Sequence, residues 1–591
     1  MTMRTGWVGG AVLVVGLWIG VGSAQMAMAG HDMGAMKEIA APEALPVPVR
    51  MEGIGNSHLA IKANGEAQVW FDQGLNLLHD FWDYESARAF EQGIRADAQC
   101  AMCYWGLYEA LAMRGSANKV YADQALDNAI RLKGKAGKGQ RLYIEAAAAA
   151  RDAEKAAGGE GHGDGSAERA IWRRAVKEDS HDLQAKLFLA GSLRDGYDDA
   201  GEPKTGTKEA IELYQEVLKV APDDSAANHY WIHAVEAGAH PELAVGSATK
   251  LARLAPASGH MVHMPGHIFY RVGDYAQAER WFAASMQVDE AYMKAQHVDV
   301  DDDWNYIHNL MYGVANLMEE GKLKEAAKLS AKISGGRGVL AATLYTYSPR
   351  DGMARLNAEL PIALRTGDWA SVSDMLRDAK VDARLKNLDF LAGALRDFAR
   401  GMQAVEAGEA GKAEEASRAL DAELWRVSQK VKDTPEEKAE EAKAPVRVAV
   451  GADAVAMPLV SNLSIMSLEL RGAILVEQKR LAEGKALFAQ AAGEEKKLGY
   501  REPPVYIRPV GEAEGGALLR AKEYADAHTA YVAALVERPE SGFALYGMAR
   551  SSEGAGDVSA ARAEYARFLA AWRNADSNAA EVAHARAYLA K

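Results

Sequence analysis

The sequence is poor in basic charge, in long apolar runs and in strand-like patterns, and each shortage excludes a class of protein. The formal net charge of -14 argues against a general nucleic-acid binder, which needs a basic face. Beyond the N-terminus no segment is apolar enough to span a bilayer, so we expect no membrane span after signal cleavage. Alternating apolar and polar residues are scarce, which makes helices the expected element of the fold.

Signatures of catalysis and of cofactor binding are missing as well. We find no P-loop, nucleophile elbow or dinucleotide fingerprint, so no nucleotide cofactor is expected. The stretch HYWIH has the histidine spacing of zinc proteases but lacks the glutamate after its first histidine. The only two cysteines, Cys100 and Cys103, are followed by Tyr104 instead of histidine, which argues against attached haem. The sequence therefore favours a binding protein over an enzyme.

The N-terminus has the pattern of an export signal. Arg4 precedes the apolar run WVGGAVLVVGLWIGVGSA, and small-residue cleavage sites follow at Ala24 and Ala29. No cysteine stands at the cleavage point, which argues against a lipoprotein; an uncleaved anchor is the alternative. We assign residues 1–29 to a signal peptide and expect a soluble exported protein, most simply a periplasmic one.

Residues 30–63 follow as a leader that we expect to be disordered. Methionines and a histidine gather around its start, in QMAMAGHDMGAM (25–36). Thioether and imidazole groups together suit copper(I). A disordered leader with chance methionines is the simpler alternative.

A helical repeat dominates the rest of the chain. The stretches NHYWIHAVEAGAHPELAVGSATKLARLAP and HMPGHIFYRVGDYAQAERWFAASMQVD align from Ala244 to Ala278, a spacing that equals the tetratricopeptide period. Small residues such as Gly266 are expected where two helices cross closely, and Gly106 and Gly515 stand at matching places in other copies. Such units cannot bury their apolar faces alone. The sequence therefore predicts an all-α, tetratricopeptide-type solenoid of stacked helical hairpins.

Residues 432–454 interrupt the array. This stretch is charged and then broken by proline, which is typical of a mobile linker. It divides the predicted solenoid into an N-terminal array at 64–431 and a C-terminal array at 455–591.

Histidines gather on one stripe of the N-terminal array. Residues 229–308 hold eight of the 15 histidines of the chain. Because a helix turns about 100° per residue, His260, His263 and His267 share an arc away from the packing face around Gly266. In tetratricopeptide arrays, which this sequence resembles, that arc lines the concave groove.

The same stripe recurs in the neighbouring repeats. The spacing from Ala244 to Ala278 maps it onto the preceding repeat, and the longer spacing from Ala278 to Ala326 maps it onto the following one. The candidate metal ligands are His229, His233, Glu236, His260, His263, His267 and His308. The four histidines that match at one repeat period are expected to face one cavity, with His260 and His308 at its edge. Glu236 is either a ligand or the acceptor that orients a ligating imidazole.

The repeat arithmetic places further side chains on the groove wall. His79 stands at the repeat position that corresponds to Arg271, and both residues are expected to line the groove. Cys100 and Cys103 fall at least two repeats from the histidines, so shared coordination is not expected. A disulfide, free thiols, a soft-metal site and a redox pair remain open for them.

A transition-metal site in the groove is the leading interpretation of this pattern. Imidazole and carboxylate groups at i, i+3 and i+4 on facing helices can chelate a metal, and imidazole suits copper, zinc or iron. One alternative is a metal-free scaffold that grips a protein or peptide partner. A second is a metalloenzyme, an oxidase or hydrolase, built in the groove.

Two loops are candidates for a share in function. The stretch VDVDDDW lacks the glycine and distal glutamate of a calcium hand, so its last aspartate, Asp303, is expected to cap the next helix. The stretch GYREPPVYIRPVGEAEGGALL contains prolines that predict an extended bend. Its Arg501, Tyr506 and Arg508 are candidates to reach the groove, and a rigid connector between repeats is the alternative.

The chain resembles a family of exported bacterial tetratricopeptide repeat proteins. The resemblance is carried by FDQGLNLLHDFWDYESARAF, CAMCYWGLYEA, HYWIHAVEAGAHPELA, HMPGHIFYRVGDYAQA, IHNL and REPPVYIRP. Family members often have an arginine and a Leu-Gly pair soon after the proline segment, where this chain has VGEAEGG. The resemblance implies an α-solenoid with a binding role and supplies no particular activity.

Overall fold

The structure is a computed structural model, and it describes most of the chain. The described residues are 36–38, 40–114, 118–157, 164–198, 200–333, 353–354, 356–377, 379, 386–430, 447–449 and 458–591. The predicted signal peptide at 1–29 lies outside them. So do the methionine- and histidine-containing stretch 25–36, apart from Met36, and the predicted linker 432–454, apart from 447–449.

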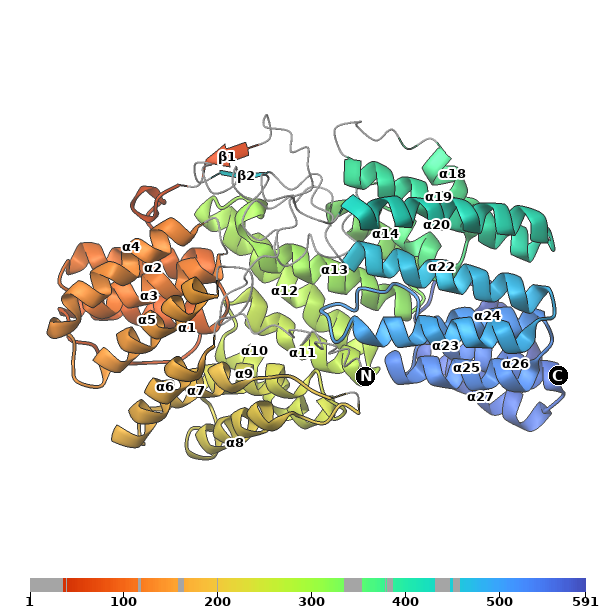
Figure 1. Cartoon of the computed structure of the whole chain (residues 1–591). Coiled ribbons are helices and arrows are strands. Elements are labelled where there is room, and N and C mark those ends of the chain that lie inside the picture. The colour runs from red at the N-terminus through yellow and green to blue at the C-terminus, as the bar shows by residue number, and fades with distance from the viewer. Residues whose placement is uncertain are drawn as a thin grey trace, which may run out of the picture.

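Helices form almost all of the regular structure in this part of the chain (Figure 1). The first half contains α1 (Gly65–His79), α2 (Asp83–Ala96), α3 (Ala101–Met113), α4 (Lys119–Leu132), α5 (Gln140–Ala156), α6 (Ser166–Glu178), α7 (Leu183–Leu193), α8 (Thr205–Val220), α9 (Ser225–Val235), α10 (Val245–Leu254), α11 (Gly259–Arg271), α12 (Tyr275–Gln296), α13 (Trp304–Glu319) and α14 (Leu323–Ile333). The second half contains α17 (Leu360–Thr366), α18 (Trp369–Arg377), α19 (Lys386–Glu406), α20 (Ala410–Lys430), α22 (Pro458–Glu477), α23 (Leu481–Lys497), α24 (Val510–Arg520), α25 (Tyr524–Glu537), α26 (Gly542–Ala555), α27 (Val558–Ala571) and α28 (Ala580–Leu589).

A few shorter elements complete the structure. The 3-10 helices are η2 (Pro42–Ala44), η4 (Lys133–Lys135), η5 (Pro241–Ala244) and η6 (Val300–Asp302). The strands β1 (Met36–Glu38) and β2 (Arg447–Ala449) pair antiparallel, with Met36 opposite Ala449. Among the described residues, no helix combines the length and the apolar character needed to cross a membrane.

Consecutive helices pack as hairpins, and the hairpins stack side by side (Figure 1). The predicted small residues stand where helices touch. A Cβ atom added to Gly266 on α11 would lie 2.3 Å from the ring of Phe282 on α12, and one added to Gly106 would lie 2.2 Å from the ring of Phe90. A larger residue at either position would push the helices apart. The predicted tetratricopeptide-type solenoid is therefore confirmed.

Side-chain caps fix the starts of the three helices that carry the histidine stripe. Asp224 accepts a hydrogen bond from the Ala227 amide at the start of α9, and Ser258 caps α11 in the same way. Asp303 accepts from the Tyr306 amide at the start of α13, as the sequence predicts. Such caps satisfy amides that have no partner within the helix and so define where each helix begins.

Two expectations about domain organisation need correction. Residues 40–63 are not a free leader, because polar side chains of α1 hold their backbone: Gln73 accepts from the Met51 amide at 3.1 Å and Asn76 from the Ser57 amide at 2.8 Å. The predicted linker also does not divide the packing. One continuous hydrophobic core includes residues from both predicted arrays, and α22 packs on α19 and α20.

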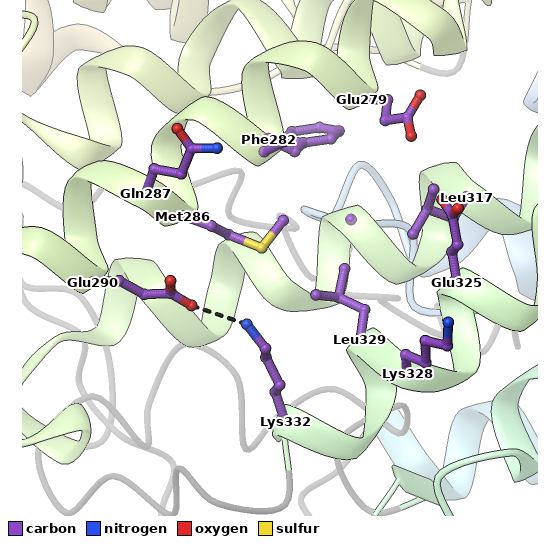
Figure 2. A pocket seen from close by; sticks show the side chains of 12 residues that line it. Glu279, Phe282, Met286, Gln287, Glu290, Leu317, Glu325, Lys328, Leu329 and Lys332 are labelled. Atoms are coloured by element: carbon purple, nitrogen blue, oxygen red, sulfur yellow. Dashed lines mark hydrogen bonds and ion pairs between the residues drawn. The ribbon is translucent and has the colours of Figure 1, made fainter.

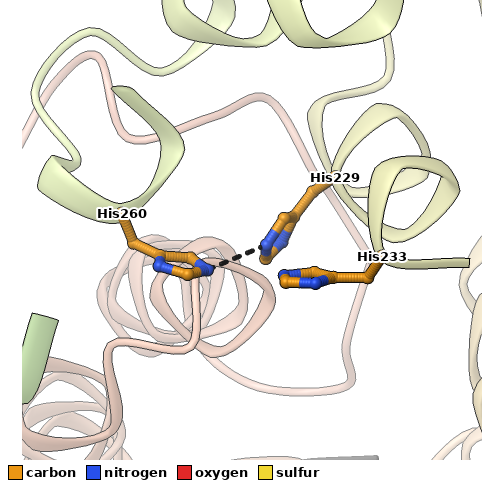
Figure 3. A group of neighbouring side chains, drawn as sticks. All are labelled: His229, His233 and His260. Carbon is orange, nitrogen blue, oxygen red and sulfur yellow. Dashed lines mark hydrogen bonds between the residues drawn. The ribbon is translucent and has the colours of Figure 1, made fainter. Parts of the chain in front are cut away.

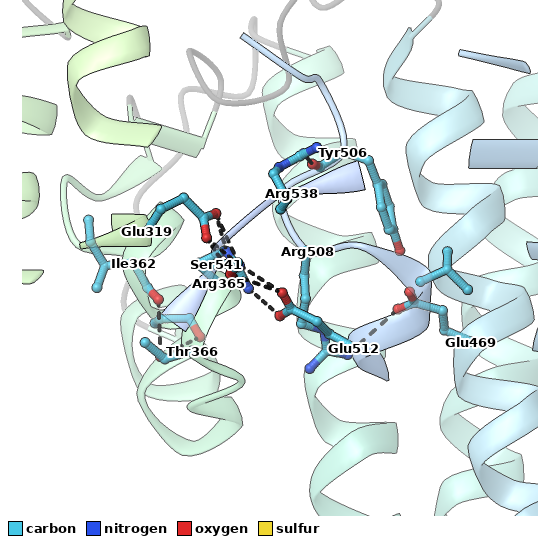
Figure 4. Close-up of polar contacts among 12 residues, drawn as sticks. Glu319, Ile362, Arg365, Thr366, Glu469, Tyr506, Arg508, Glu512, Arg538 and Ser541 are labelled. Atoms are coloured by element: carbon cyan, nitrogen blue, oxygen red, sulfur yellow. Dashed lines mark hydrogen bonds and ion pairs between the residues drawn. The ribbon is translucent and has the colours of Figure 1, made fainter. Parts of the chain in front are cut away.

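A buried ion-pair network joins the two predicted arrays as well (Figure 4). Arg365 on α17 donates to Glu319 on α13 and, from Nη2 at 3.0 Å, to Glu512 on α24. All three side chains are buried, and a buried guanidinium is tolerated only where carboxylates pair with it. The pairing therefore requires α13, α17 and α24 to pack together.

Candidate metal centre

Six histidines from three helices meet inside the solenoid. Helix α9 supplies His229 and His233, α11 supplies His260, His263 and His267, and α13 supplies His308. The pairs 229/233 and 263/267 are four residues apart, so each pair lies on one face of its helix. None of the six side chains is more than 5% exposed.

The six imidazoles form two groups of three. The first triad is His229, His233 and His260 (Figure 3), and the second triad is His263, His267 and His308. Within each triad, one ring nitrogen from every member lies within 4.8 Å of the others. The triads adjoin, because the ring centroids of His260 and His263 are 5.9 Å apart and those of His233 and His267 are 6.1 Å apart.

Three of the imidazoles are held at Nδ1 by groups that accept a hydrogen bond. His229 Nδ1 lies 2.6 Å from the His79 carbonyl oxygen, which can only accept. His260 Nδ1 lies 3.0 Å from Asn305 Oδ1, and His263 Nδ1 lies 2.7 Å from Asn309 Oδ1. The amide groups of these asparagines donate elsewhere, Asn305 to Asp289 and Asn309 to the Phe282 carbonyl. Each imidazole therefore carries its proton on Nδ1 and a lone pair on Nε2.

Glu236 fixes two more imidazoles, one in each triad. Its Oε1 accepts from His233 Nδ1, and its Oε2 accepts from His267 Nδ1 at 2.9 Å. Burial by itself raises the pKa of Glu236, but the two imidazoles hold it well below its usual value. A carboxylate that holds Nδ1–H in this way makes Nε2 a better metal ligand.

The free Nε2 nitrogens face one another. His229 Nε2 lies 3.1 Å from His260 Nε2, and His263 Nε2 lies 2.5 Å from His267 Nε2. Within the described residues, the Nε2 atoms of His233 and His308 have no hydrogen-bond partner. Since His229 and His260 each carry their proton on Nδ1, their two lone pairs meet without a donor, and buried acceptors without a donor are costly. A cation between these nitrogens removes that cost.

The pKa shifts favour the neutral form of His229, His260, His263 and His308. Burial, followed by the neighbouring imidazoles, lowers the pKa of His229 and of His263 well below the usual value. Burial lowers the pKa of His260 and His308 in the same direction. Neutral imidazoles are the form that binds metal.

Aromatic rings enclose both triads. The centroid of the Phe81 ring lies 4.6, 5.3 and 5.5 Å from the ring centroids of His229, His233 and His260 in the first triad. The Tyr312 ring lies 4.5 to 5.4 Å from those of the second triad. The Trp304 ring packs on one imidazole of each triad, and its centroid lies 5.2 Å from that of His260 and 5.6 Å from that of His308.

These rings correct the expectation of an open groove. The turn between α1 and α2 carries Phe81 onto the histidines, and the segment after α23 covers them near Glu236. His260 and His308 are full members of the two triads and do not stand at an edge. The stripe therefore faces inward, as predicted, but the inside of the superhelix is filled, so the histidines belong to the core.

The segment after α23 contributes two side chains that no sequence pattern indicated. Glu502 forms a third group with His233 and Glu236, and Tyr500 donates to Glu236 at 3.1 Å. Burial, and then the charge of Glu236, raises the pKa of Glu502 well above its usual value. The prolines of this segment predicted a bend, but they did not predict which side chains would point to the histidines.

Two of the side chains expected from that segment, Tyr506 and Arg508, have other partners. Tyr506 and Arg508 lie beside Glu469 on α22 (Figure 4), with Arg508 Nη2 at 3.7 Å from the carboxylate. Burial raises the pKa of Glu469 to about 8, with Arg508 opposing the rise. Neither Tyr506 nor Arg508 is part of the histidine cluster.

The two residues predicted to line the groove have structural roles. His79 is buried, with Nδ1 at 2.7 Å from the Tyr230 hydroxyl and Nε2 at 2.6 Å from Gln184 Oε1. Arg271 is half-buried and donates to the carbonyl oxygens of Glu236 and Gly238. His79 thus links α1 to α7 and α9, and Arg271 holds the turn that follows α9. Neither side chain offers a free nitrogen to an ion.

Cys100 and Cys103 form a disulfide. Both are fully buried in the packing of α3, so the expectation that they lie on a groove wall is wrong. Cys100 caps α3 and accepts from the Cys103 amide at 3.1 Å, and the Cys103 sulfur packs against Gly93 on α2. The disulfide is one of the alternatives that the sequence left open for these two residues.

Comparisons of this chain with known proteins return remote matches to solved structures. No family model and no curated protein matches it. Among solved structures it is matched to a human IFIT1 dimer with m7Gppp-AAAA, at 12% identity over 85% of this chain and 96% of that chain, with a TM-score of 0.32. Yeast Tom70 matches at 12% identity over 88% and 95%, with a TM-score of 0.27. Scores this low carry no argument about function.

Proposed function

We propose that this protein is an exported binding protein that holds transition-metal ions, copper first, in its two histidine triads. The observation that supports this most is the arrangement of facing Nε2 atoms, which lie 3.1 Å apart in the first triad and 2.5 Å apart in the second. In the first triad the protons of His229 and His260 are held on Nδ1 by acceptors, so neither ring has a donor to place between these nitrogens. An ion about 2.0–2.1 Å from each nitrogen would satisfy them together.

The donor set favours copper among the candidates. Each triad offers three imidazoles, and neither includes a thiolate or a carboxylate. Magnesium, calcium and manganese prefer oxygen ligands, and for nitrogen sites the affinity of divalent ions rises toward copper. Zinc and iron remain the competitors, because imidazole also suits them.

An exported location supports the same proposal. The signal pattern at 1–29 is one argument, and the Cys100–Cys103 disulfide is a second. Disulfides persist in oxidising compartments such as the periplasm and are rare in the cytosol. N-terminal sequencing of the protein purified from the periplasmic cell fraction would test the exported location. A chain that retains residues 1–29 in the cytosol would contradict it.

Elemental analysis and metal titration test the binding itself. The purified protein should contain up to two ions per chain, and anaerobic titration with Cu(I), Zn(II) and Fe(II) should show two sites. The double variant His233→Ala/His267→Ala removes one ligand from each triad and should lose both ions. The matched control is His240→Ala, since this imidazole is 65% exposed and pairs with Glu242, away from the triads. Equal metal content in both variants would overturn the proposal.

A metal-free scaffold is the second candidate, and one pocket favours it (Figure 2). The pocket lies between α12, α13 and α14 and has a volume of about 410 Å³. It is lined by apolar residues that include Phe282, Met286 and Leu329 and by charged residues such as Glu290 and Lys332, which form an ion pair. Binding of a peptide library by the metal-free protein, lost in Met286→Glu, would support this function.

A further inference from the structure

We infer that the two triads form one dinuclear copper centre that binds dioxygen between its two ions. This inference rests on the proposed function and specifies the ligand of the same site. It requires that the ions be close to each other, that each keep an open coordination position, and that only a small molecule reach them.

The imidazoles at which the two triads adjoin are close enough to each other for a two-metal site. His260 and His263 are neighbours at 5.9 Å between centroids, and His233 and His267 are neighbours at 6.1 Å. Glu236 ties the triads together, because one carboxylate accepts from an imidazole of each. Paired ions in such sites lie about 3.5–4 Å apart, so one diatomic ligand can contact both.

Three protein ligands leave each ion with an open position. Sites in which the protein supplies three imidazoles keep the fourth position for water or a substrate. The Nδ1 side of five of the six rings is occupied by His79, Glu236, Asn305 and Asn309. These contacts hold five of the six rings in place, with Nε2 left to the other members of the triad.

The surroundings restrict the ligand to a small, uncharged molecule. Phe81, Trp304 and Tyr312 pack on the imidazoles, and none of these rings is more than 6% exposed. A large substrate cannot touch the ions without displacing these rings, and a charged one would lose its hydration. Dioxygen is small, uncharged and able to take one electron from each of two copper ions.

The redox step is balanced within the centre. Two Cu(I) ions each give one electron to dioxygen and become Cu(II), while dioxygen becomes a bound peroxide. A bond forms between each copper and the ligand, the O–O σ bond stays intact, and no proton or leaving group is needed. Release of dioxygen returns one electron to each copper.

Anaerobic loading followed by oxygen addition tests the inference. The purified protein is loaded with two Cu(I) per chain, and oxygen uptake, the visible spectrum and the electron paramagnetic resonance signal are recorded. We expect one dioxygen consumed per two copper ions, a new charge-transfer band, and no resonance signal because the two Cu(II) spins couple. His308→Ala should bind one copper, lose the band, and show the signal of isolated Cu(II) when oxidised.

The outcomes separate this inference from the proposed function. If two copper ions bind but oxygen leaves them as Cu(I), or gives two uncoupled Cu(II) signals, the dioxygen inference is wrong and metal binding stands. If neither copper nor zinc binds, both proposals fail. Because His308→Ala could fold poorly, its circular dichroism is compared with that of the native chain, and His263→Ala serves as the second variant with the same expectation.

Discussion

The two histidine triads come from matching positions in consecutive repeats, yet different parts of the chain hold them in place. Two members of the first triad lie exactly one repeat period before two members of the second. The second triad is covered by Tyr312 of its own helix α13 and held at His263 by Asn309 of the same helix. The first triad is covered by Phe81 and held at His229 by the carbonyl of His79, both from the N-terminal hairpin.

This difference shows what a repeat supplies and what it does not. The repeat places imidazole nitrogens at equivalent positions on neighbouring helices. The hydrogen bonds that fix the imidazole tautomers and the aromatic rings that cover the imidazoles come from whichever segment packs over them. The second triad is therefore built mostly by its own repeats, whereas the first depends on a long-range contact with α1 and α2. Each of the following predictions tests that contrast.

Metal removal should have the largest effect. An ion bound only by the folded chain stabilises it by roughly 2.7 kcal/mol at a hundredfold excess over its dissociation constant, so two ions add roughly twice that. Thermal melting with copper and with a chelator measures the total. His233→Ala should lose the increment of the first triad only, and His267→Ala that of the second only.

The stabilisation that metal adds has to be measured as the difference between the metal-loaded and the metal-free form of the same variant. The repeat pattern predicts these side chains in an open groove, where alanine would leave the metal-free protein unchanged. The structure overturns that expectation, because both side chains are buried and both donate to Glu236. Both variants should melt lower without metal. A variant that keeps both increments would contradict the assignment of ions to triads.

Phe81→Ala should destabilise the protein by about 3–5 kcal/mol, the usual cost of emptying a buried aromatic site. The residue is 1% exposed and has a φ of 57°, so its neighbours hold it in a conformation that side chains avoid. Metal affinity should fall at the first triad and stay unchanged at the second. Tyr312→Ala is the mirror variant, and equal effects of both variants on both triads would remove the contrast.

Acid should destabilise the metal-free protein through buried imidazoles. Burial lowers the pKa of His79, which lies beside the first triad, to about 4, with Gln184 opposing the shift. The unfolded chain titrates near 6.5, so between these values it binds more protons than the folded chain. This contribution to the free energy of unfolding is complete above pH 6.5 and falls by about 3 kcal/mol toward pH 4.

Urea unfolding of the chelated protein between pH 7.5 and 4.5 measures this slope. His79→Gln should make the slope shallower, because the titrating ring is gone. The exposed control His240→Ala should keep the native slope. An unchanged slope in His79→Gln would mean that this imidazole is accessible to protons in the folded state.

The asparagines give the smallest and most selective test. Loss of an acceptor that orients a ligating imidazole costs about 10–100-fold in metal affinity. Asn305→Ala should have this effect at the first triad, through His260, and Asn309→Ala at the second, through His263. Copper titration in His308→Ala and His233→Ala backgrounds, which each keep one intact triad, measures the two sites separately. A loss at the wrong triad would contradict the assignment.

Much of the candidate site could be predicted from periodicity. The repeat period brought His229 and His233 into register with His263 and His267, because repeats of equal length stack with equal rotation. Glu236 followed from the same stripe. Glu502 could not be found in this way, since it lies on an irregular segment far along the chain from the histidines, and irregular segments have no period. The same holds for Tyr500.

The sequence by itself determined the helices, their hairpin pairing and the inward stripe of histidines, because apolar spacing and small residues act locally, within one or two repeats. Only the tertiary structure decided that the groove is filled, that the histidines divide into two triads, and that the predicted linker does not divide the core. Those features depend on contacts such as Phe81 with His229 and Arg365 with Glu512, made across long stretches of chain. Packing of distant segments depends on the shapes of whole surfaces, which no local spacing encodes.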